Sequence, residues 1–322
     1  MNNILTKSGK VGAIFVCALL LVVSVSAQIT LRTALDTDKD GKADFSVQRP
    51  TDNVWYIAKS GGGFTFQPFG SSSTDFQTPG DFDGDGRGDI AVWRETTGIW
   101  YYILSSTNTV SGVQFGTQGD EPVARDYDGD GKTDVAVVRR TGGVMNWYAL
   151  RSTNGSLLAV QFGASSDYIA PGDYDGDKKF DLAVQRPGVN ASDQAIFFIL
   201  QSSNNTLMSI PWGFGNDEVV PGDYDGDGKT DVAVVRVGAT DNSALSWYIR
   251  QSSNGELKSA AFGATGIDLN VQNDYDGDGK TDIAVWRDTN GFFYVLRSTD
   301  NGLTAAQWGA PNDIPIASYD TH

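Results

Sequence analysis

The chain has 322 residues, with 40 acidic and 24 basic side chains and a net charge of −16. This balance argues against a nucleic-acid partner, because phosphate binding needs clustered cations. The chain also carries 36 aromatic residues (8 Trp, 12 Tyr and 16 Phe), which are too many for a disordered acidic chain. The excess acid must therefore be held within a fold, and bound cations are one way to hold it.

Residues 1–27 have the pattern of a secretory signal peptide. Two lysines and no acidic residue precede an apolar run, Val11–Val25, and small residues follow it, as signal peptidase requires. The alternative is an uncleaved membrane anchor, although the run is shorter than the about 20 residues of a spanning helix. We expect a mature single domain of residues 28–322, placed in the periplasm, on the cell surface or in the medium. The only cysteine, Cys17, lies in the leader, so no disulfide is expected.

From residue 36 onward one unit recurs six times. Each unit begins with a cluster of aspartates, and successive clusters begin 45, 45, 47, 50 and 51 residues apart. The clusters begin at Asp36, Asp81, Asp126, Asp173, Asp223 and Asp274. A short apolar run ending in arginine follows each cluster: Phe45–Arg49, Ile90–Arg94, Val135–Arg139, Leu182–Arg186, Val232–Arg236 and Ile283–Arg287.

Each unit continues with an aromatic segment, a Ser/Asn/Gly turn and an aromatic–glycine pair. The aromatic segments begin at Trp55, Trp100, Trp147, Phe197, Trp247 and Phe292. The glycines of the pairs are Gly70, Gly116, Gly163, Gly213, Gly263 and Gly309. With the short stretch that leads into the next cluster, each unit holds four strand-like segments separated by turn residues. No apolar period of 3.6 residues is long enough to predict a helix.

Four strands in 45–51 residues are typical of a β-propeller blade. We therefore expect an all-β propeller of four-stranded blades. Six copies predict six blades, with seven as the alternative. One strand, Ile314–Ser318, is left over, because Tyr319 stands where a seventh cluster would begin. We expect this strand to close the ring by pairing in the first blade.

The Asp clusters have the pattern D-x-D-x-D-G-x-x-D. Carboxylates at positions 1, 3, 5 and 9 and the backbone carbonyl of position 7 would supply five or more oxygens. Calcium takes roughly 6–8 oxygens in flexible geometry, whereas magnesium demands octahedral geometry and keeps its waters. Without a cation, crowded carboxylates repel one another. An EF-hand is excluded because position 12 is valine in every loop instead of glutamate. The alternative is an acidic surface turn without an ion.

The candidate ligands of up to six calcium ions are the four aspartates of each loop and, through its carbonyl, the residue at position 7. In chain order they are Asp36, Asp38, Asp40, Lys42 and Asp44; Asp81, Asp83, Asp85, Arg87 and Asp89; Asp126, Asp128, Asp130, Lys132 and Asp134; Asp173, Asp175, Asp177, Lys179 and Asp181; Asp223, Asp225, Asp227, Lys229 and Asp231; and Asp274, Asp276, Asp278, Lys280 and Asp282. The fourth loop has Lys178 at position 6, where the others have glycine, so we expect its site to be the weakest.

The order of Asp loop, strand, aromatic strand, Phe-Gly and Ala-Pro-Gly-Asp resembles the FG-GAP (VCBS-type) repeats of integrin α headpieces and many bacterial secreted proteins. The resemblance covers about Ile29 to Asp320. It implies that each Asp loop joins the first two strands of a blade and holds calcium. Integrin headpieces have seven blades and only some calcium loops, whereas all six loops here have the ligands. Nothing resembles the integrin leg domains, so a receptor role is not implied.

Strand alternation predicts that the Asp loops and the Ser/Asn turns share one face, and that the loops between second and third strands share the other. The latter loops are longest at Pro187–Ala195 and Val237–Ser246. We expect ligand recognition there, since variable loops on a rigid scaffold often carry binding; neutral insertions are the alternative. The six arginines that end the second strands could ring an anion site, but we favour pairing with a neighbouring carboxylate or stacking on an aromatic ring.

Catalysis is not expected. The only histidine is His322, and the mature chain would lack cysteine, which excludes histidine-assisted nucleophiles and histidine-ligated zinc. We favour a monomeric extracellular adhesion or recognition module for a carbohydrate or protein ligand, without a membrane span after cleavage. The alternatives are a structural envelope or matrix protein without a discrete ligand, and a calcium-assisted polysaccharide lyase that uses lysine or arginine as its base.

Overall fold

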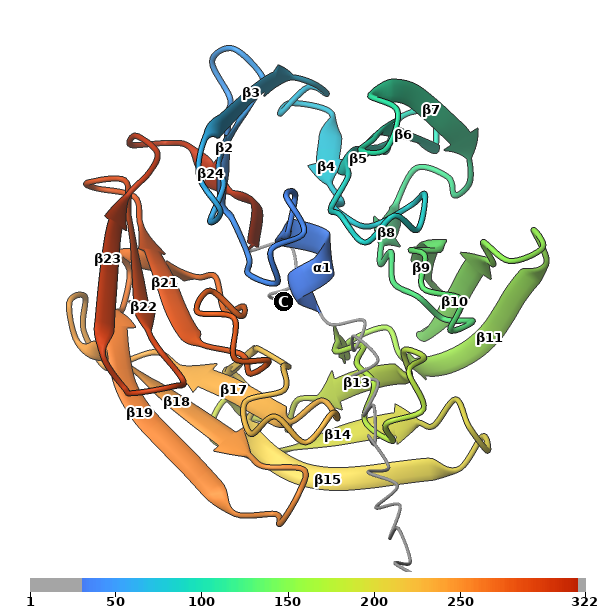
Figure 1. Ribbon diagram of the computed structural model, residues 1–322. Coiled ribbons are helices and arrows are strands. Elements are labelled where there is room, and N and C mark those ends of the chain that lie inside the picture. The colour runs from blue at the N-terminus through green and yellow to red at the C-terminus, as the bar shows by residue number, and fades with distance from the viewer. Residues whose placement is uncertain (1–30, 318–322) are drawn as a thin grey trace, which may run out of the picture.

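The structure is a computed structural model that describes residues 31–317. Six antiparallel sheets of four strands each stand in a ring around a central axis (Figure 1). One short helix, α1 (Leu31–Leu35), lies near the centre of the ring (Figure 1). The prediction of an all-β propeller with six four-stranded blades is confirmed. The predicted signal peptide, residues 1–27, lies outside the described residues.

The strands of each blade are given from the centre outward. Blade one contains β24 (Ile314–Pro315), β1 (Phe45–Arg49), β2 (Val54–Ala58) and β3 (Phe64–Pro68). Blade two contains β4 (Asp75–Gln77), β5 (Ile90–Arg94), β6 (Ile99–Leu104) and β7 (Thr109–Gln114). Blade three contains β8 (Asp120–Pro122), β9 (Val135–Thr141), β10 (Val144–Leu150) and β11 (Leu157–Ala164).

The other three blades follow the same order. Blade four contains β12 (Tyr168–Ile169), β13 (Leu182–Arg186), β14 (Gln194–Leu200) and β15 (Leu207–Phe214). Blade five contains β16 (Glu218–Val219), β17 (Val232–Arg236), β18 (Ala244–Arg250) and β19 (Leu257–Ala264). Blade six contains β20 (Asp268–Asn270), β21 (Ile283–Arg287), β22 (Phe292–Leu296) and β23 (Leu303–Gln307).

Burial along the strands follows their distance from the axis. The second strands are buried at consecutive positions, as in β17, because both of their faces pack against neighbouring blades. The outer strands alternate between exposed and half-buried residues, as in β19. Each third strand carries a buried aromatic residue, such as Trp247, and two of the second strands add Trp93 and Trp286. The core is therefore divided among the contacts between adjacent blades.

The aromatic segment and the aromatic–glycine pair of a unit meet in space. The indole N–H of Trp147 donates a hydrogen bond of 2.8 Å to the carbonyl of Phe162, and Trp247 does the same to Phe262 at 2.9 Å. The next residue, Gly163, has a φ of 97°, which glycine adopts without steric cost. The recurring pair thus forms a turn whose aromatic residue supplies the carbonyl that accepts the hydrogen bond of a buried indole N–H.

The C-terminal strand closes the ring, as predicted. In β24, Pro315 pairs with Val47 of β1, and Ile314 pairs with Gln48. A second closure runs through the Asp loops, where the carbonyl of each first aspartate accepts a hydrogen bond from position 8 of the next blade's loop. Its last link, from Ala43 to Asp274, measures 2.7 Å and joins blade one to blade six.

The helix α1 is a difference from the sequence-based expectation. Because the C-terminal β24 occupies the inner position of blade one, the chain before Asp36 is not needed as a strand. It forms one helical turn instead, and the carbonyl of Leu35 accepts a hydrogen bond of 2.9 Å from Asp44. Within residues 31–317, no helix has the length and apolarity needed to cross a membrane.

Candidate metal sites

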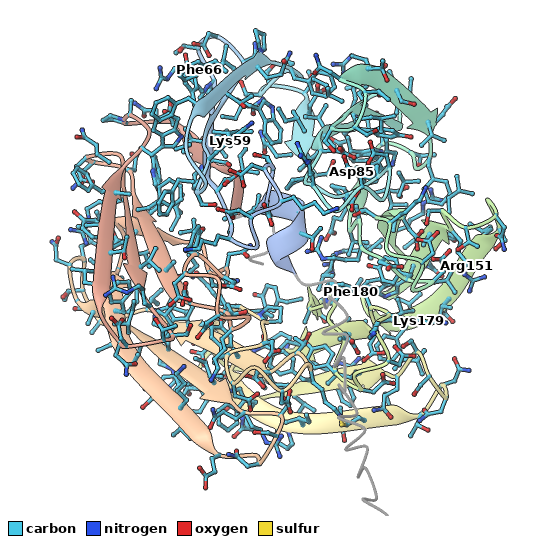
Figure 2. The ribbon with its side chains drawn as sticks, in the orientation of Figure 1. Lys59, Phe66, Asp85, Arg151, Lys179 and Phe180 are labelled. Atoms are coloured by element: carbon cyan, nitrogen blue, oxygen red, sulfur yellow. The ribbon has the colours of Figure 1, made fainter. Side chains whose placement is uncertain are left out.

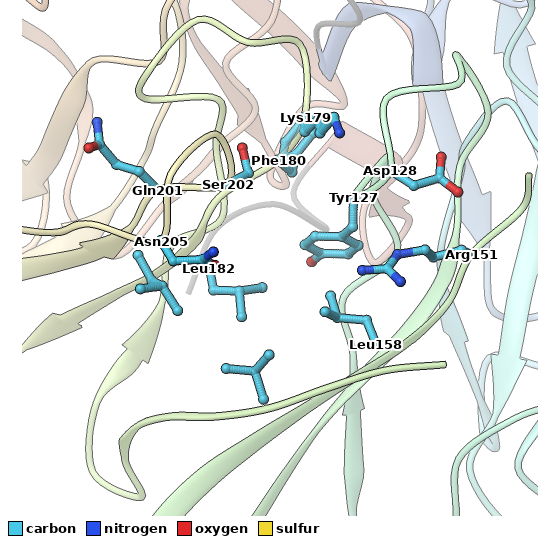
Figure 3. Close-up of a pocket in the computed structure, with 12 residues that line it drawn as sticks. Tyr127, Asp128, Arg151, Leu158, Lys179, Phe180, Leu182, Gln201, Ser202 and Asn205 are labelled. Carbon is cyan, nitrogen blue, oxygen red and sulfur yellow. The ribbon is translucent and has the colours of Figure 1, made fainter. Parts of the chain in front are cut away.

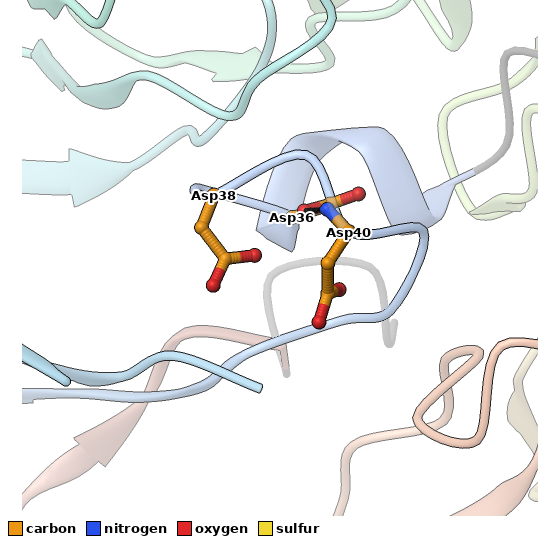
Figure 4. A group of neighbouring side chains, drawn as sticks. All are labelled: Asp36, Asp38 and Asp40. Atoms are coloured by element: carbon orange, nitrogen blue, oxygen red, sulfur yellow. Dashed lines mark hydrogen bonds between the residues drawn. The ribbon is translucent and has the colours of Figure 1, made fainter. Parts of the chain in front are cut away.

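Five of the six Asp loops connect the first and second strands of their blades, as predicted, whereas the first loop connects α1 to β1, because the C-terminal β24 supplies the first strand of blade one. In each of five loops, three carboxylates bring one oxygen each to within 4.8 Å of the others. Figure 4 shows the first of these groups, which directly follows α1. The groups are Asp36, Asp38 and Asp40; Asp81, Asp83 and Asp85; Asp126, Asp128 and Asp134; Asp173, Asp175 and Asp181; and Asp223, Asp225 and Asp231, with one further group of this kind.

The loops do not gather all four predicted carboxylates equally. Positions 1 and 3 belong to each of the five groups, whereas position 5 is the third member in the first two loops and position 9 in the next three. The backbone N–H of Lys132, at position 7, donates to Asp130 at 2.9 Å. The ligand role of the position-7 carbonyls stays a prediction.

The first aspartate shapes its loop. In the third loop, one carboxylate oxygen of Asp126 accepts a hydrogen bond from the N–H of Gly129 at 2.6 Å, and the other accepts one from Gly131 at 2.9 Å. These glycines have φ values of 79° and 92°, a region that other residues enter at a cost. The glycine spacing of the motif thus folds the backbone around the carboxylate.

The last aspartate ties the loop to the neighbouring turn. Asp134 is fully buried, and its two oxygens accept hydrogen bonds from the N–H groups of Tyr127 at 2.9 Å and Ser152 at 2.6 Å. The hydroxyl of Ser152 donates to Asp130 at 2.9 Å, and that of Thr153 donates to Asp128 at 2.7 Å. The predicted sharing of one face by Asp loops and Ser/Asn turns is therefore confirmed; we call it the Asp-loop face.

The sequence analysis missed the part that the turn plays in the site. A serine occupies the first position of every turn and bonds to its Asp loop; these serines are Ser60, Ser105, Ser152, Ser202, Ser252 and Ser298. The recurrence of this serine at a constant place in the unit was the signal that could have found it.

Burial sets the electrostatics of the loops. It raises the pKa of Asp126 and of Asp134 to about 6 and that of Asp231 to about 7, because the charged form is poorly solvated there. Coulombic repulsion between the aspartates acts in the same direction. In the first loop, Oδ1 of Asp38 is buried and accepts no hydrogen bond within the described residues. The loops therefore fit a hard cation, which would replace the missing donor and offset the repulsion.

Two loops depart from the glycine pattern. Lys178, at position 6 of the fourth loop, has a φ of 73°, and Lys39, at position 4 of the first loop, has a φ of 64°. Both lie in the left-handed region that favours glycine. The fourth loop thus keeps the backbone shape of the others with a strained residue; whether its site is the weakest stays a prediction.

The basic side chains at position 7 reach across to the preceding blade. Lys132 lies over Gly84, where a β-carbon would come within 2.8 Å of the lysine chain. Lys179 lies over Gly129 in the same way, at 2.9 Å. A side chain at Gly84 or Gly129 would have to displace the lysine above it, so these neighbouring loops interlock; the first loop, with Lys39 at position 4, is the exception.

The six arginines that end the second strands lie at the opposite end of the blades. Arg94 binds Asp75 through hydrogen bonds of 2.7 and 2.8 Å, and its guanidinium lies 5.0 Å from the ring centre of Tyr101. The other pairs are Arg49–Asp313, Arg139–Asp120, Arg186–Asp167, Arg236–Asp217 and Arg287–Asp268. The interpretation as paired and stacked arginines is confirmed.

The two long loops predicted to bind a ligand also lie at that end. In blade five, Asn242 donates a hydrogen bond of 3.1 Å to the carbonyl of Thr265, and the hydroxyl of Thr265 accepts one of 2.7 Å from Gly238. The loop is thus anchored to the connection toward blade six. Its role in recognition stays a prediction.

Comparison with known proteins supports the repeat assignment. The FG-GAP-like repeat family matches residues 36–92 and 126–184. Together with the six-bladed propeller, this match confirms the resemblance to FG-GAP repeat propellers. No curated protein matches the chain.

Several solved structures share the fold. TolB from Acinetobacter baumannii is 15% identical with a TM-score of 0.59, over 88% of this chain and 68% of that one. Oligogalacturonate lyase from Vibrio parahaemolyticus is 11% identical with a TM-score of 0.50, over 86% and 77%. An arginine-to-alanine mutant of AofleA from Arthrobotrys oligospora is 9% identical with a TM-score of 0.50, over 88% and 90%. At such identities these likenesses concern the fold alone.

Proposed function

We propose that this chain is a secreted, calcium-binding β-propeller that serves outside the cell as an adhesion or recognition module for carbohydrate or protein ligands. The observation that carries the proposal is the sixfold repetition, on one face of a closed ring, of an acidic loop whose first and last aspartates are buried and which is bonded to the adjacent turn. Such a ring is a rigid scaffold whose variable loops are free to carry binding.

In each loop, the carboxylates of positions 1 and 3, with those of positions 5 and 9, would hold the ion. Calcium prefers carboxylate oxygens and tolerates irregular geometry. When bound, it supplies positive charge among carboxylates that include Asp126 and Asp134, whose pKa values burial raises. The loop and its serine turn then bind one another without mutual repulsion among the aspartates.

Calcium would also change the charge of the whole domain. The full chain has a net charge of −16, and without the two lysines of the leader the mature domain carries −18. Six calcium ions would add twelve positive charges and leave −6, so the repulsion between the ring and acidic partners would be much weaker. Ligand binding would then depend on calcium in two ways, through the shape of the ring and through its charge.

Binding is tested with the mature protein, residues 28–322, on an array of polysaccharides and matrix proteins, in calcium and again in EDTA. Selective binding that EDTA abolishes is the expected result. A blank array from a protein whose melting temperature still responds to calcium would favour a structural envelope or matrix role. Unsaturated uronic-acid products, detected by their ultraviolet absorbance, would favour the lyase.

Export is tested separately. The protein is recovered from the culture medium and from the cell envelope, and its N-terminus is sequenced. We expect cleavage after Ala27; an intact leader on envelope-bound protein would support the membrane anchor instead.

A further inference from the structure

A cavity of about 230 Å³ opens between blades three and four on the Asp-loop face (Figure 3). Its floor is apolar and includes Leu158 of β11 and Leu182 of β13. The ring of Tyr127 adds to the floor, and its hydroxyl is already bonded to the carbonyl of Val123 at 2.8 Å. The floor therefore offers hydrocarbon and ring surface but no free hydroxyl from this tyrosine.

Two cationic side chains stand at this cavity. Arg151 follows β10, and Lys179 comes from the Asp loop of blade four; both line the cavity, and the guanidinium of Arg151 is directed toward Tyr127 (Figures 2 and 3). Within residues 31–317, neither side chain forms an ion pair, and the recorded side-chain hydrogen bond of Arg151 is a long one of 3.4 Å to the hydroxyl of Ser156. Their charge is thus available to a ligand.

Two neutral amides and one carboxylate complete the lining. The amide side chains of Gln201 and Asn205 line the blade-four side. Asp128 also lines the cavity, but its carboxylate accepts hydrogen bonds from Thr153 and belongs to the third group of candidate metal ligands. A calcium ion there would offset the one negative charge that faces the two cations.

The same arrangement occurs at a second place in the ring. A cavity of about 170 Å³ between blades one and two is lined by Lys59 and Arg87, which stand at the repeat positions of Arg151 and Lys179. Its Asn108 stands at the position of Asn205. In blades four and five the position of Arg151 is glutamine, and in blade six Arg297 is ion-paired with Asp300 at 3.0 Å. At two places in the ring, a cavity is therefore lined by two cationic side chains that have no carboxylate partner among residues 31–317.

We propose that these two inter-blade cavities bind carboxylate-bearing sugar residues, that is, uronic acids of an acidic polysaccharide. The proposal rests on the proposed recognition function and names its ligand class. The carboxylate lies between the arginine and the lysine, because a guanidinium binds a carboxylate through two parallel hydrogen bonds. The apolar face of the sugar ring covers the leucine floor, and its hydroxyls bond to the amides at the edge.

The lining favours a sugar over an acidic peptide. An aspartate or glutamate side chain carries too few methylenes to cover the apolar floor, and would leave part of that apolar surface in contact with water. A neutral sugar would leave the two cations without a partner.

The test is a calorimetric titration of the mature protein in calcium with a galacturonic-acid trisaccharide, a galactose trisaccharide and poly-glutamate. We expect the uronate to bind at two sites, and both other probes to bind at least tenfold more weakly. Arg151→Gln installs the residue that blades four and five already carry; it should reduce the stoichiometry from two toward one, as should Lys59→Gln. The double variant should lose both sites.

Arg250→Gln is the matched control, because it removes an arginine beside the same turn of blade five and should leave binding unchanged. Melting curves of every variant check that the fold is kept. Equal binding of poly-glutamate, or unchanged stoichiometry in Arg151→Gln, would overturn the proposal. If the protein selects an array ligand but ignores uronates, the cavity proposal fails while the recognition function stands; if it binds nothing at all, both fail.

Discussion

Arg49 and Asp313 bind each other through two hydrogen bonds of 2.9 Å although 264 positions separate them in the chain. The other five pairs of this series join residues only 19 positions apart within one blade. The Arg49–Asp313 pair is thus the one that holds the C-terminal strand β24 in blade one. Its arginine–carboxylate bonding is the same as in the other five pairs, but this pair also closes the ring.

Asp313→Asn should therefore destabilise the ring more than Asp75→Asn, which breaks the equivalent pair inside blade two. Each change leaves an arginine without its buried carboxylate. We expect a loss of about 2–3 kcal/mol for Asp75→Asn, below the range for fully buried pairs, because 33% of the Arg94 side chain is exposed. Asp313→Asn should lose more, since the closing contact spans nearly the whole chain.

Urea unfolding measures the loss, and amide hydrogen exchange in β1 locates it. Exchange at Val47 and Gln48, which pair with β24, should accelerate in Asp313→Asn and not in Asp75→Asn. Equal losses of stability together with unchanged exchange in β1 would show that the backbone pairing of β24 closes the ring without the ion pair.

The repeat made much of this architecture predictable. The second strand ends at arginine in five of the six blades as expected, because that arginine has a fixed carboxylate partner near the start of the same blade. The exception is β9, which continues to Thr141. The six repeats predicted the blade count, and the leftover strand predicted the closure, since a strand after the last unit has one free place in the ring.

Contacts between blades were not predictable, because a single unit does not say what its neighbour presents. The loop motif predicts a role for Lys132 only through its backbone carbonyl, as a metal ligand. In the structure its side chain also packs on Gly84 of the preceding loop. The cavity at Arg151 depends in the same way on Lys179 of the next unit. The turn serines were also missed, because the aspartate that Ser152 binds lies 22 positions away.

Removal of calcium should lower the melting temperature. An ion that binds only the folded state adds about 2.7 kcal/mol per site at a hundredfold excess over its dissociation constant, so several sites together produce a large shift. Calorimetric melts in calcium and in EDTA measure it, with magnesium as the control for a nonspecific ionic effect. Superimposable melts in calcium and EDTA would refute a structural role for the ion.

Lys178→Gly should improve the fourth loop. A non-glycine residue in the left-handed region costs about 1–2 kcal/mol, and Lys178 has a φ of 73°, whereas glycine occupies this position in the other five loops. We expect a gain in stability below about 1 kcal/mol, because glycine also raises the entropy of the unfolded chain, and tighter calcium binding at the fourth site.

The reverse change, Gly228→Lys in the fifth loop, is the matched control and should weaken calcium binding there. Site-resolved titration, by the amide signals of Lys179 and Lys229, distinguishes the two loops. If Lys178→Gly weakened its own site, the lysine side chain would be a positive contributor to the loop, and backbone strain would not explain the ranking of the sites.

The metal-free protein should become less stable as the pH rises from about 4 to 7. Burial raises the pKa of Asp134 to about 6 and of Asp231 to about 7 in the folded state, above the ordinary value of 3.8. Between these values the folded chain binds more protons than the unfolded chain, so the free energy of unfolding falls with increasing pH. In calcium the trend should reverse, because protons compete with the ion for the same carboxylates. Thermal melts at pH 5 and 7.5, each in calcium and in EDTA, test both signs. A melting temperature in EDTA that is no higher at pH 5 than at pH 7.5 would show that these carboxylates do not titrate with raised pKa values.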